Sequence, residues 1–389
     1  MIQLTRLKWL IKLRSGDAIT NENLIDDYTK YPVYGGGKIF SYYNAFNIEN
    51  TILIGRVGAN CGTITKINDK AFATDNALVV QSSLNLNYLF YVLASAELNN
   101  LNTANAQPLI TAGNVLNHNA YFENDIEKQK LIANFLDKKC EKIDKLISLE
   151  ETAITELNEY KNQLTVKYTT KGVRKTLLKQ SNIDWVGETP KHWQIIPLNA
   201  IFNEHSCKNF KMQENNLLSL SYGNIIRKNI NTDFGLLPEN FEGYNIVEKG
   251  DIVLRLTDLQ NDQRSLRTGL VQERGIITSA YITLRNIVNA NPDYLRYLLH
   301  SADICKIFYN LGSGIRQNLT FIGLRRMELV LPPKDEQDEI VLFLNNKYKV
   351  IDNLISLKQQ KITELKEYKK SLIYEYVTGK KQPPKKDTK

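Results

Sequence analysis

The sequence predicts an α+β fold in which two globular domains are joined by two long antiparallel helices. These helices form a coiled coil, and the two halves of the chain are related by a pseudo-two-fold axis. One long helical segment occurs twice, with an offset of 208 residues that carries Gln129 to Gln337. Both copies lack Pro and Gly until Gly172 and Gly379, where Gly is typical of a helix end. Short strand-like runs separated by turn residues precede each copy.

The two helical segments have apolar residues at steps of three and four, as in a helix with one apolar face. A helix of about 42 residues is ~60 Å long, too long for one small domain to cover. We therefore expect the two copies to pack against each other, antiparallel if the halves are related by a two-fold axis. The alternative is that each is a core helix of its own domain. The residues expected to pack in the coiled coil are Ile143, Leu146, Ile147, Ile154, Leu157, Leu164, Ile351, Leu354, Ile355, Ile362, Leu365 and Leu372.

The order of these segments predicts the domain organisation. Strand-like runs such as residues 51–58 precede the first helix, and runs such as residues 251–256 precede the second. Further helices are expected at residues 86–98 and 293–309. The predicted parts are a first domain (1–125), a first long helix (126–172), a linker (173–184), a second domain (185–333), a second long helix (334–380) and a basic disordered tail (381–389).

Composition restricts the class of protein. The formal net charge is +8 and the isoelectric point is about 9.0, which suits a polyanionic partner. The four cysteines are far apart and have no metal-binding spacing, as is usual for reduced thiols in the cytosol. There is no apolar run of membrane-spanning length and no signal peptide. We expect a cytoplasmic protein without a membrane segment.

Motifs for catalysis are missing from the sequence. None of the four histidines belongs to a metal-binding motif, and no phosphate-binding loop occurs, so we expect no metal site and no catalytic residue. Asn291-Pro-Asp-Tyr294 resembles the motif of amino-methyltransferases but lacks its second proline. The simpler interpretation is a helix start, with Asn291 as the N-cap and Pro292 in the first turn.

Basic, amide and acidic side chains gather in the turns of both domains. Arg and Lys pair with guanine, Asn and Gln with adenine, and Asp accepts from cytosine. For any single residue, a solvated surface or a phosphate contact is the simpler interpretation, so the prediction depends on the clusters. The candidates for DNA binding are Lys38, Arg56, Asn60, Lys66 and Gln107 in the first domain, and Arg227, Arg255, Asp258, Gln260, Arg264, Arg267, Arg316 and Gln317 in the second.

Several segments resemble the specificity (S) subunits of Type I restriction–modification systems. Leu331-Pro-Pro-Lys-Asp-Glu-Gln337 and the helix after it resemble the second conserved region of that family. Gly55-Arg-Val-Gly-Ala-Asn60 resembles a pattern of its target-recognition domains. Trp185-Val-Gly-Glu-Thr-Pro-Lys-His-Trp193 resembles the start of such a domain, and the first domain departs from the family by lacking this start.

The resemblance implies a DNA-sequence specificity subunit that binds a bipartite double-stranded target, with one half-site for each domain. It implies two modification (methyltransferase) subunits and two ATP-dependent restriction subunits as partners. S-adenosylmethionine, ATP and Mg²⁺ then belong to those partners, and this chain is non-catalytic and holds no cofactor. The alternatives are the specificity subunit of a fused Type II-like system, a self-contained DNA methyltransferase or endonuclease, and a coiled-coil scaffold without a role at DNA.

Overall fold

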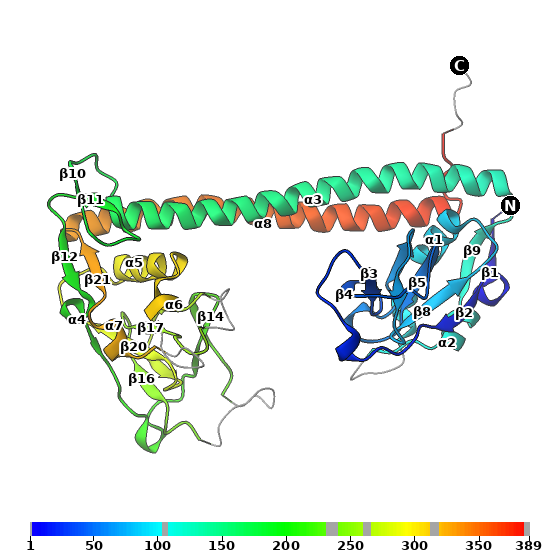
Figure 1. The fold of residues 1–389 in the computed structure, drawn as a ribbon. Helices are drawn as coiled ribbons and strands as arrows, with labels where there is room; N and C mark the ends of the chain where they lie inside the picture. Colours follow the sequence, from blue (N-terminus) through cyan, green and yellow to red (C-terminus); the bar gives the residue numbers. More distant parts are fainter. Residues whose placement is uncertain (1, 103–107, 231–239, 260–265, 312–318, 385–389) are drawn as a thin grey trace. The chain divides into compact units, whose positions relative to one another are not determined.

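The structure is a computed structural model of the chain, shown in Figure 1. It describes residues 2–102, 108–230, 240–259, 266–311 and 319–384. The chain divides into two compact units, one formed by Met1–Glu151 with Gln359–Lys389 and the other by Thr152–Lys358. Each unit therefore contains one globular domain together with about half of each long helix.

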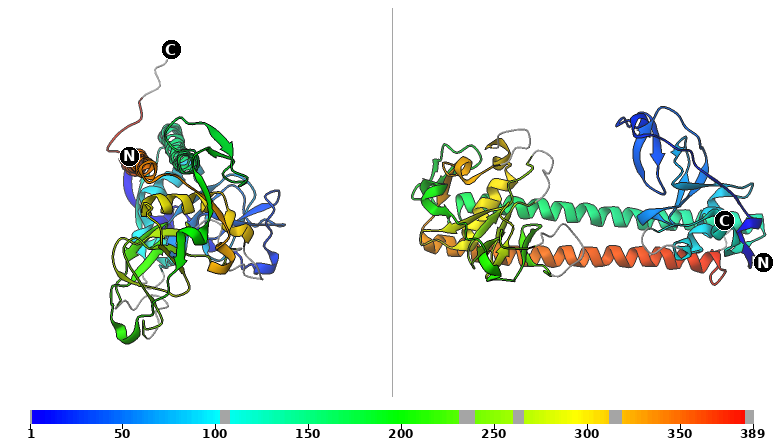
Figure 2. Two further views of the ribbon diagram at one scale, coloured as in Figure 1. Left: turned by 90° about the vertical axis from the view of Figure 1, so that its left-hand side faces the viewer. Right: turned by 90° about the horizontal axis from the view of Figure 1, so that it is seen from below.

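The two long helices are α3 (Ile126–Lys171) and α8 (Lys334–Val377). In the first unit, Asp144 of α3 forms an ion pair with Lys369 of α8 (Oδ2–Nζ 2.7 Å). In the second unit, Lys161 of α3 pairs with Asp352 of α8 (Nζ–Oδ1 2.7 Å). Within the first unit, Phe135 meets Tyr376 while Asp144 meets Lys369, and within the second, Lys161 meets Asp352 while Tyr168 meets Phe343. Higher numbers on α3 thus meet lower numbers on α8, and the halves of α3 and α8 in each unit run antiparallel (Figures 1 and 2). The predicted fold class is confirmed.

Contacts between the helices are duplicated by the 208-residue repeat. The offset carries Asp144 to Asp352 and Lys161 to Lys369, so the same ion pair occurs once in each unit with the helices exchanged. An aromatic pair is duplicated in the same way. Phe135 packs on Tyr376 with 4.5 Å between ring centroids in the first unit, and Tyr168 packs on Phe343 at 4.4 Å in the second. The pseudo-symmetry therefore extends to single side chains.

Ten of the twelve residues predicted for the coiled coil are buried or half-buried. They are Ile143, Ile147, Ile154, Leu157 and Leu164 of α3 and Ile351, Ile355, Ile362, Leu365 and Leu372 of α8. The prediction is wrong for Leu146 and Leu354, whose exposures are 44% and 43%. Each lies one residue before a half-buried position, Ile147 or Ile355, which is about 100° around the helix. A seam between only two helices is too narrow to reach them.

The first domain is built on a four-stranded antiparallel sheet in the order β2-β8-β5-β6. Buried α1 residues such as Tyr88, Leu89 and Val92 form a core with Ile52 and Ile54 of β5. β1 pairs with β9, which leads into α3, and β3 pairs antiparallel with β4 and parallel with β7. The bounds are β1 Ile2–Arg6, β2 Lys12–Ser15, β3 Tyr31–Tyr34, β4 Ile39–Tyr43, β5 Thr51–Gly55, β6 Ile64–Ile67, β7 Phe72–Ala73, β8 Ala77–Gln81, β9 Asn119–Glu123, α1 Leu86–Ser95 and α2 Ala112–Asn117.

The second domain has a four-stranded antiparallel sheet in the corresponding order, β13-β20-β17-β18. β12 pairs with β21 before α8, and the hairpins β10–β11 and β14–β15 and the pair β16–β19 complete the domain. The bounds are β10 Leu178–Gln180, β11 Glu188–Pro190, β12 Gln194–Pro197, β13 Phe202–Glu204, β14 Leu218–Ser221, β15 Asn224–Arg227, β16 Asn245–Val247, β17 Ile252–Leu254, β18 Thr268–Leu270, β19 Gly275–Ile277, β20 Ile282–Asn286, β21 Glu328–Leu331, α4 Leu198–Ile201, α5 Pro292–Ile304, α6 Ile307–Leu311 and α7 Phe321–Leu324.

The predicted single helix at 293–309 is two helices, α5 and α6. Lys306 between them has φ +60°, a left-handed conformation that interrupts an α-helix. The helix start at Asn291 is confirmed, since its side-chain oxygen accepts from the Asp293 N–H (2.9 Å) and Pro292 is the first helical residue. Asn85 caps α1 in the same way, accepting from the Tyr88 N–H (3.0 Å).

Helices α1 and α5 occupy equivalent places in the two domains. Tyr91 of α1 donates from its hydroxyl to Asp137 of α3 (2.7 Å). Tyr297 of α5 donates to Asn345 of α8 (2.6 Å). Asp137 and Asn345 are related by the 208-residue offset, so each domain is attached to its long helix by the same contact. Both the sheet order and this attachment show an internal duplication.

Candidate nucleic-acid interface

The candidate residues of the first domain lie around one end of β5. Arg56 follows this strand, and its N–H donates to the carbonyl of Asn76 (3.0 Å). Gly36, in the loop that carries Lys38, has φ +88°, and a Cβ there would lie 3.1 Å from the same carbonyl. The turn containing Asn60 also packs on this strand end, because a Cβ at Gly55 would overlap the Asn60 carbonyl. The structure therefore brings the segments carrying Lys38, Arg56 and Asn60 together.

Lys66 lies apart from that cluster. It is on β6, next to Thr65, whose hydroxyl donates to the Gly37 carbonyl (3.0 Å). Successive side chains on a strand point to opposite faces, so Lys66 points away from the Lys38 loop. Gln107 is outside the described residues, and its contact with DNA stays a prediction.

The second domain places Arg255 directly after β17, as Arg56 directly follows β5 in the first. The Arg255 N–H donates to the Arg267 carbonyl (2.9 Å), and Asp258 has φ +55° in the same segment. This positional match between the two arginines supports their selection as candidates. Gln260, Arg264, Arg316 and Gln317 lie outside the described residues, so their selection stays a prediction.

Arg227 lies on the edge hairpin β14–β15 and is largely exposed. It forms an ion pair with Glu273, with Nε 2.5 Å from Oε1. The hydrogen bond from Arg227 lowers the pKa of the Glu273 carboxyl, and the same contact raises the pKa of Arg227. A phosphate at this guanidinium would therefore compete with a carboxylate that already binds it.

Arg267 has a different role from the predicted one. Its side chain is fully buried, with 0% exposure. Its guanidinium donates to the carbonyls of Arg255 (2.9 Å) and Thr257 (3.1 Å) and to the hydroxyl of Tyr309 (3.0 Å). A group enclosed in this way does not face a ligand in solution, so we remove Arg267 from the DNA-contacting set. It instead braces the segment that carries Arg255 and Asp258.

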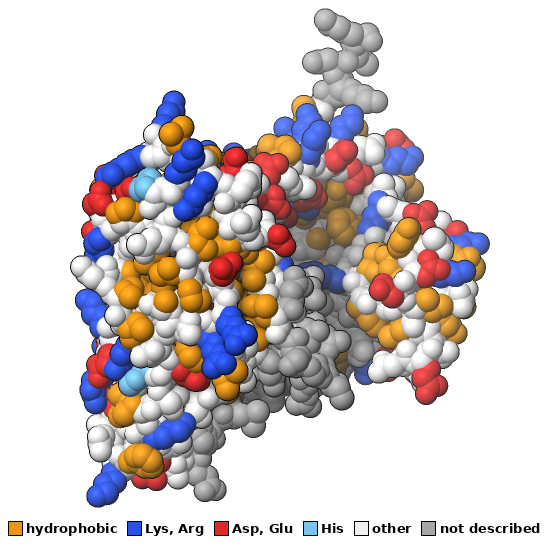
Figure 3. Space-filling model, turned by 60° about the vertical axis from the view of Figure 1, so that its left-hand side comes forward, with side chains coloured by type: hydrophobic (Ala, Val, Ile, Leu, Met, Phe, Trp, Pro, Cys, Tyr) orange, Lys and Arg blue, Asp and Glu red, His pale blue; other side chains and the backbone are white. Residues whose placement is uncertain are grey.

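Lys and Arg side chains do not form one continuous basic surface on the face shown in Figure 3. There they are scattered among acidic and apolar side chains of the second domain. The net charge of +8 is therefore not concentrated on this face. Among the described residues, no group of three or more His, Cys, Asp and Glu side chains is arranged to hold a metal ion. A search of the same residues finds no helix with the length and apolar character needed to span a membrane.

The long helices expose apolar side chains at equivalent positions. In the first unit, Leu146 and Leu149 of α3 are 44% and 57% exposed. In the second unit, Leu354 and Leu357 of α8 are 43% and 62% exposed. The 208-residue offset relates the two pairs, so each unit carries one copy of the same leucine pair. The sequence analysis had placed Leu146 and Leu354 in the helix seam and missed this surface.

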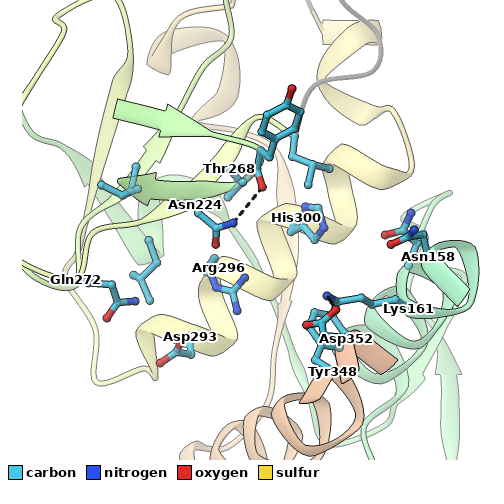
Figure 4. Close-up of a pocket in the computed structure, with 16 residues that line it drawn as sticks. Asn158, Lys161, Asn224, Thr268, Gln272, Asp293, Arg296, His300, Tyr348 and Asp352 are labelled. Atoms are coloured by element: carbon cyan, nitrogen blue, oxygen red, sulfur yellow. Dashed lines mark hydrogen bonds and ion pairs between the residues drawn. The ribbon is translucent and has the colours of Figure 1, made fainter. Parts of the chain in front are cut away.

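A second feature that the sequence analysis missed is a cavity of about 430 Å³ in the second unit. Figure 4 shows Arg296 and His300 of α5 lining it, together with Lys161 of α3 and Tyr348 of α8. A comparison of the two repeats is the sequence signal that could have indicated this cavity. Phe90 and Ala94 occupy the places of Arg296 and His300 in the first domain, so these two polar residues are particular to the second.

Comparison with known proteins shows which proteins this chain is similar to. Residues 2–159 match the family described as "Type I restriction modification DNA specificity domain". The "Type I restriction enzyme EcoprrI specificity subunit" of Escherichia coli is 33% identical over 135 residues. That match covers 33% of this chain and 33% of the relative, so it spans about a third of the relative's length. The "Type I restriction enzyme MjaVIII specificity subunit" of Methanocaldococcus jannaschii is 26% identical over 95% of this chain and 82% of its own length.

The fold is also similar to a solved structure. A chain from work titled as the structural basis of complex assembly and conformational transition of the type I R-M system matches with a TM-score of 0.64. It is 14% identical, and the match covers 97% of this chain and 98% of that chain. The chain is thus similar in sequence to specificity subunits of Type I restriction–modification systems, and residues 2–159 match their specificity domain.

Proposed function

We propose that this chain is the DNA-sequence specificity subunit of a Type I restriction–modification complex and that each domain binds one half of a bipartite double-stranded target. The observation that carries the proposal is the duplication itself. Both domains have the same four-strand order and are attached to their long helices by the same tyrosine contact. Two equivalent domains suit a target with two parts, and the long helices then set the spacing between the half-sites.

The segments at the ends of β5 and β17 are the proposed sites of DNA contact. Lys38, Arg56 and Asn60 would act in the first domain, and Arg255 and Asp258 in the second. A correct bidentate contact to a base edge contributes roughly 1–3 kcal/mol of discrimination. Contacts to phosphates position a protein on the duplex without reading its sequence. Lys66, Arg227 and the candidates outside the described residues stay in the proposed set, as phosphate or base contacts.

The proposed partners supply the chemistry. Two modification subunits would bind S-adenosylmethionine, and two restriction subunits would use ATP and Mg²⁺. The target adenine would be flipped into a modification subunit, so this chain would act without catalysis or a cofactor of its own, in the cytoplasm.

Exchanging the first domain tests the division of the target. Replacement of residues 1–125 by the corresponding domain of another specificity subunit, expressed with the modification subunits, is expected to change one half of the methylated motif. The other half and the spacing should stay the same, because the second domain and both helices are unaltered. Methylome sequencing measures the result. Expression without the modification subunits is the control and should give no methylation. A change in both half-sites would exclude one domain for each half-site.

The duplicated leucines are the proposed docking surface for the modification subunits. Two identical surfaces suit two copies of one partner, and exposed leucines supply apolar area that a partner can bury. Asp in place of both Leu149 and Leu357 is expected to weaken binding of the modification subunits roughly tenfold or more, since a central interface side chain can contribute about 2 kcal/mol.

Isothermal titration of the purified chain with the modification subunit measures this loss. Ile322→Asp is the control, because Ile322 is 69% exposed on α7, outside both long helices. Equal affinities for the double variant, the control and the unaltered chain would remove the leucines from the interface.

A further inference from the structure

The cavity beside α5 is a built polar site within the second unit. Its walls come from α3, α5 and α8 and from the hairpin β14–β15. Its volume of about 430 Å³ lies in the range of small-molecule pockets, roughly 300–1,000 Å³. Side-chain amides of Asn158, Asn224 and Gln272 line it, and Arg296 points into it (Figure 4).

Arg296 is the strongest anion-binding group in this cavity. Its guanidinium lies 4.0 Å from the ring centroid of Tyr297, which holds the side chain in place. Within the described residues, no carboxylate oxygen lies within 4.0 Å of its nitrogens. Lys161, the second cation, is already paired with Asp352 (2.7 Å) and lies over the Tyr348 ring at 4.2 Å. Arg296 also shares a side-chain hydrogen bond with Tyr297, and its remaining N–H donors are available to a ligand.

The charged groups that line the cavity are two cations, Arg296 and Lys161, and two carboxylates, Asp293 and Asp352. The pKa of His300 is lowered to about 4, first by burial and then by the positive charges of Arg296 and Lys161. Its imidazole is therefore neutral at pH 7 and able to share a hydrogen bond. Asp293 also lines the cavity, in the first turn of α5. Thr268 adds a hydroxyl that is 2% exposed as a residue and has no hydrogen-bond partner in the described structure.

An aromatic side chain stands at the edge of the cavity. Tyr222 is 86% exposed at the tip of the hairpin β14–β15. It has φ +46° and is followed by Gly223 at φ +76°. Asn or Gly is preferred at the first of these positions, so a Tyr there is unfavourable for the turn itself. An exposed ring beside amides and a cation suits a nucleobase, which stacks on aromatic faces.

The duplication provides an internal comparison. The first unit keeps the ion pair of Asp144 with Lys369 and the tyrosine contact to α3. At the places of Arg296, His300 and Tyr348 it has Phe90, Ala94 and Cys140, which pack in its hydrophobic core. The helix pairing therefore forms without these three polar residues. Tyr348 packs on Tyr297 in the second unit, whereas Arg296 and His300 line the cavity and are not required for the pairing of the helices.

From this geometry we propose that the cavity beside α5 binds a nucleotide, with its phosphate at Arg296 and Lys161 and its base near Tyr222 and the amides. Arg pairs with phosphate through two parallel hydrogen bonds, and amide side chains match the edges of bases. The phosphate belongs either to a free nucleotide or to a nucleic-acid backbone. The site requires no particular DNA sequence, so it goes beyond the proposed reading of a bipartite target.

Nuclear magnetic resonance of the histidine side chains in the full chain tests the site. The sequence has four histidines, and a His300→Gln variant identifies the His300 signal. The chain is titrated in turn with inorganic phosphate, deoxyadenosine monophosphate and a short DNA duplex of arbitrary sequence. We expect the His300 signal to move while those of His118, His192 and His205 stay in place during the phosphate and mononucleotide titrations.

Matched variants separate the site from the fold. Arg296→Gln and Lys161→Gln are expected to weaken the response of His300 about tenfold or more. Lys369→Gln removes the equivalent ion pair of the first unit and should leave the response unchanged. A response to the mononucleotide assigns a free nucleotide, and a response to DNA alone that Arg296→Gln abolishes assigns the nucleic-acid backbone. The proposal fails if no probe moves the signal or if Arg296→Gln responds as the unaltered chain does. Failure of DNA recognition would leave the mononucleotide result intact, so the two proposals can fail separately.

Discussion

Arg267→Met should lower the free energy of unfolding of the second unit by about 3–5 kcal/mol. The guanidinium is fully buried and donates to two main-chain carbonyls and one tyrosine hydroxyl. Removing the guanidinium leaves these buried oxygens without a hydrogen-bond donor, and each unsatisfied acceptor costs roughly 1–3 kcal/mol. Met fills much of the same volume, so the loss of hydrogen bonds dominates over the loss of packing. We also expect weaker DNA binding, because the braced segment carries Arg255 and Asp258.

Tryptophan fluorescence during urea unfolding measures this effect. The chain has three tryptophans, and Trp9 is the one in the first unit. A Trp9→Phe background therefore makes the signal report on Trp185 and Trp193 of the second unit. Arg227→Met is the matched control, since Arg227 is exposed and an ion pair at the surface contributes little to stability. If Arg267→Met and Arg227→Met lower the free energy of unfolding by similar amounts, the buried hydrogen bonds of Arg267 do not contribute more to stability than a surface ion pair.

Glu336→Ala should cost the second unit about 2–4 kcal/mol. This carboxylate is buried in the first turn of α8 and accepts from Trp193 Nε1 (3.0 Å). It also lies 2.5 Å from His192 Nε2 and 3.7 Å from Arg174 Nη1. Ala would leave the buried indole N–H without an acceptor and would free the segment 185–193 from the start of the helix.

The same fluorescence measurement reports on this variant directly, because Trp193 is one of the bonded groups. Its emission should shift as the indole loses its hydrogen bond. Glu339→Ala is the control. Glu339 is also bonded to Arg174 but is about half exposed, so its loss should lower stability much less than the loss of Glu336. An unchanged emission in Glu336→Ala would show that the carboxylate does not hold the indole in solution.

The repeat explains why so much of the fold was predictable from the sequence. An ungapped offset of 208 residues identified both long helices, and a two-fold relation between the copies required them to be antiparallel. The strand runs around residues 51–58 and 251–256 also became equivalent strands, β5 and β17. The break at Lys306 was not predictable, because Lys, unlike Gly or Asn, rarely adopts the left-handed conformation found there.

The candidate site was less predictable, because a sequence gives residue types without their surroundings. Arg267 and Arg255 are the same residue type in similar sequence surroundings. In the structure the Arg267 side chain is buried and bonded to carbonyls, whereas Arg255 follows the end of β17. Leu146 looked like its neighbour Ile147, but the narrow seam half-buries Ile147 and leaves Leu146 exposed. Arg296 and His300 belong to no motif, and only the folding of three helices and a hairpin around one cavity brings them together.

The exchanged ion pairs of α3 and α8 also dictate which way the helices can run. If the two copies lay parallel and in register, each residue would face its own counterpart 208 positions away. Asp144 would then meet Asp352, and Lys161 would meet Lys369, so these two attractions would become repulsions between like charges. The apolar positions of a duplicated helix suit a parallel pair as well as an antiparallel one. The charged positions therefore specify the relative direction of the two helices, which leucines alone do not.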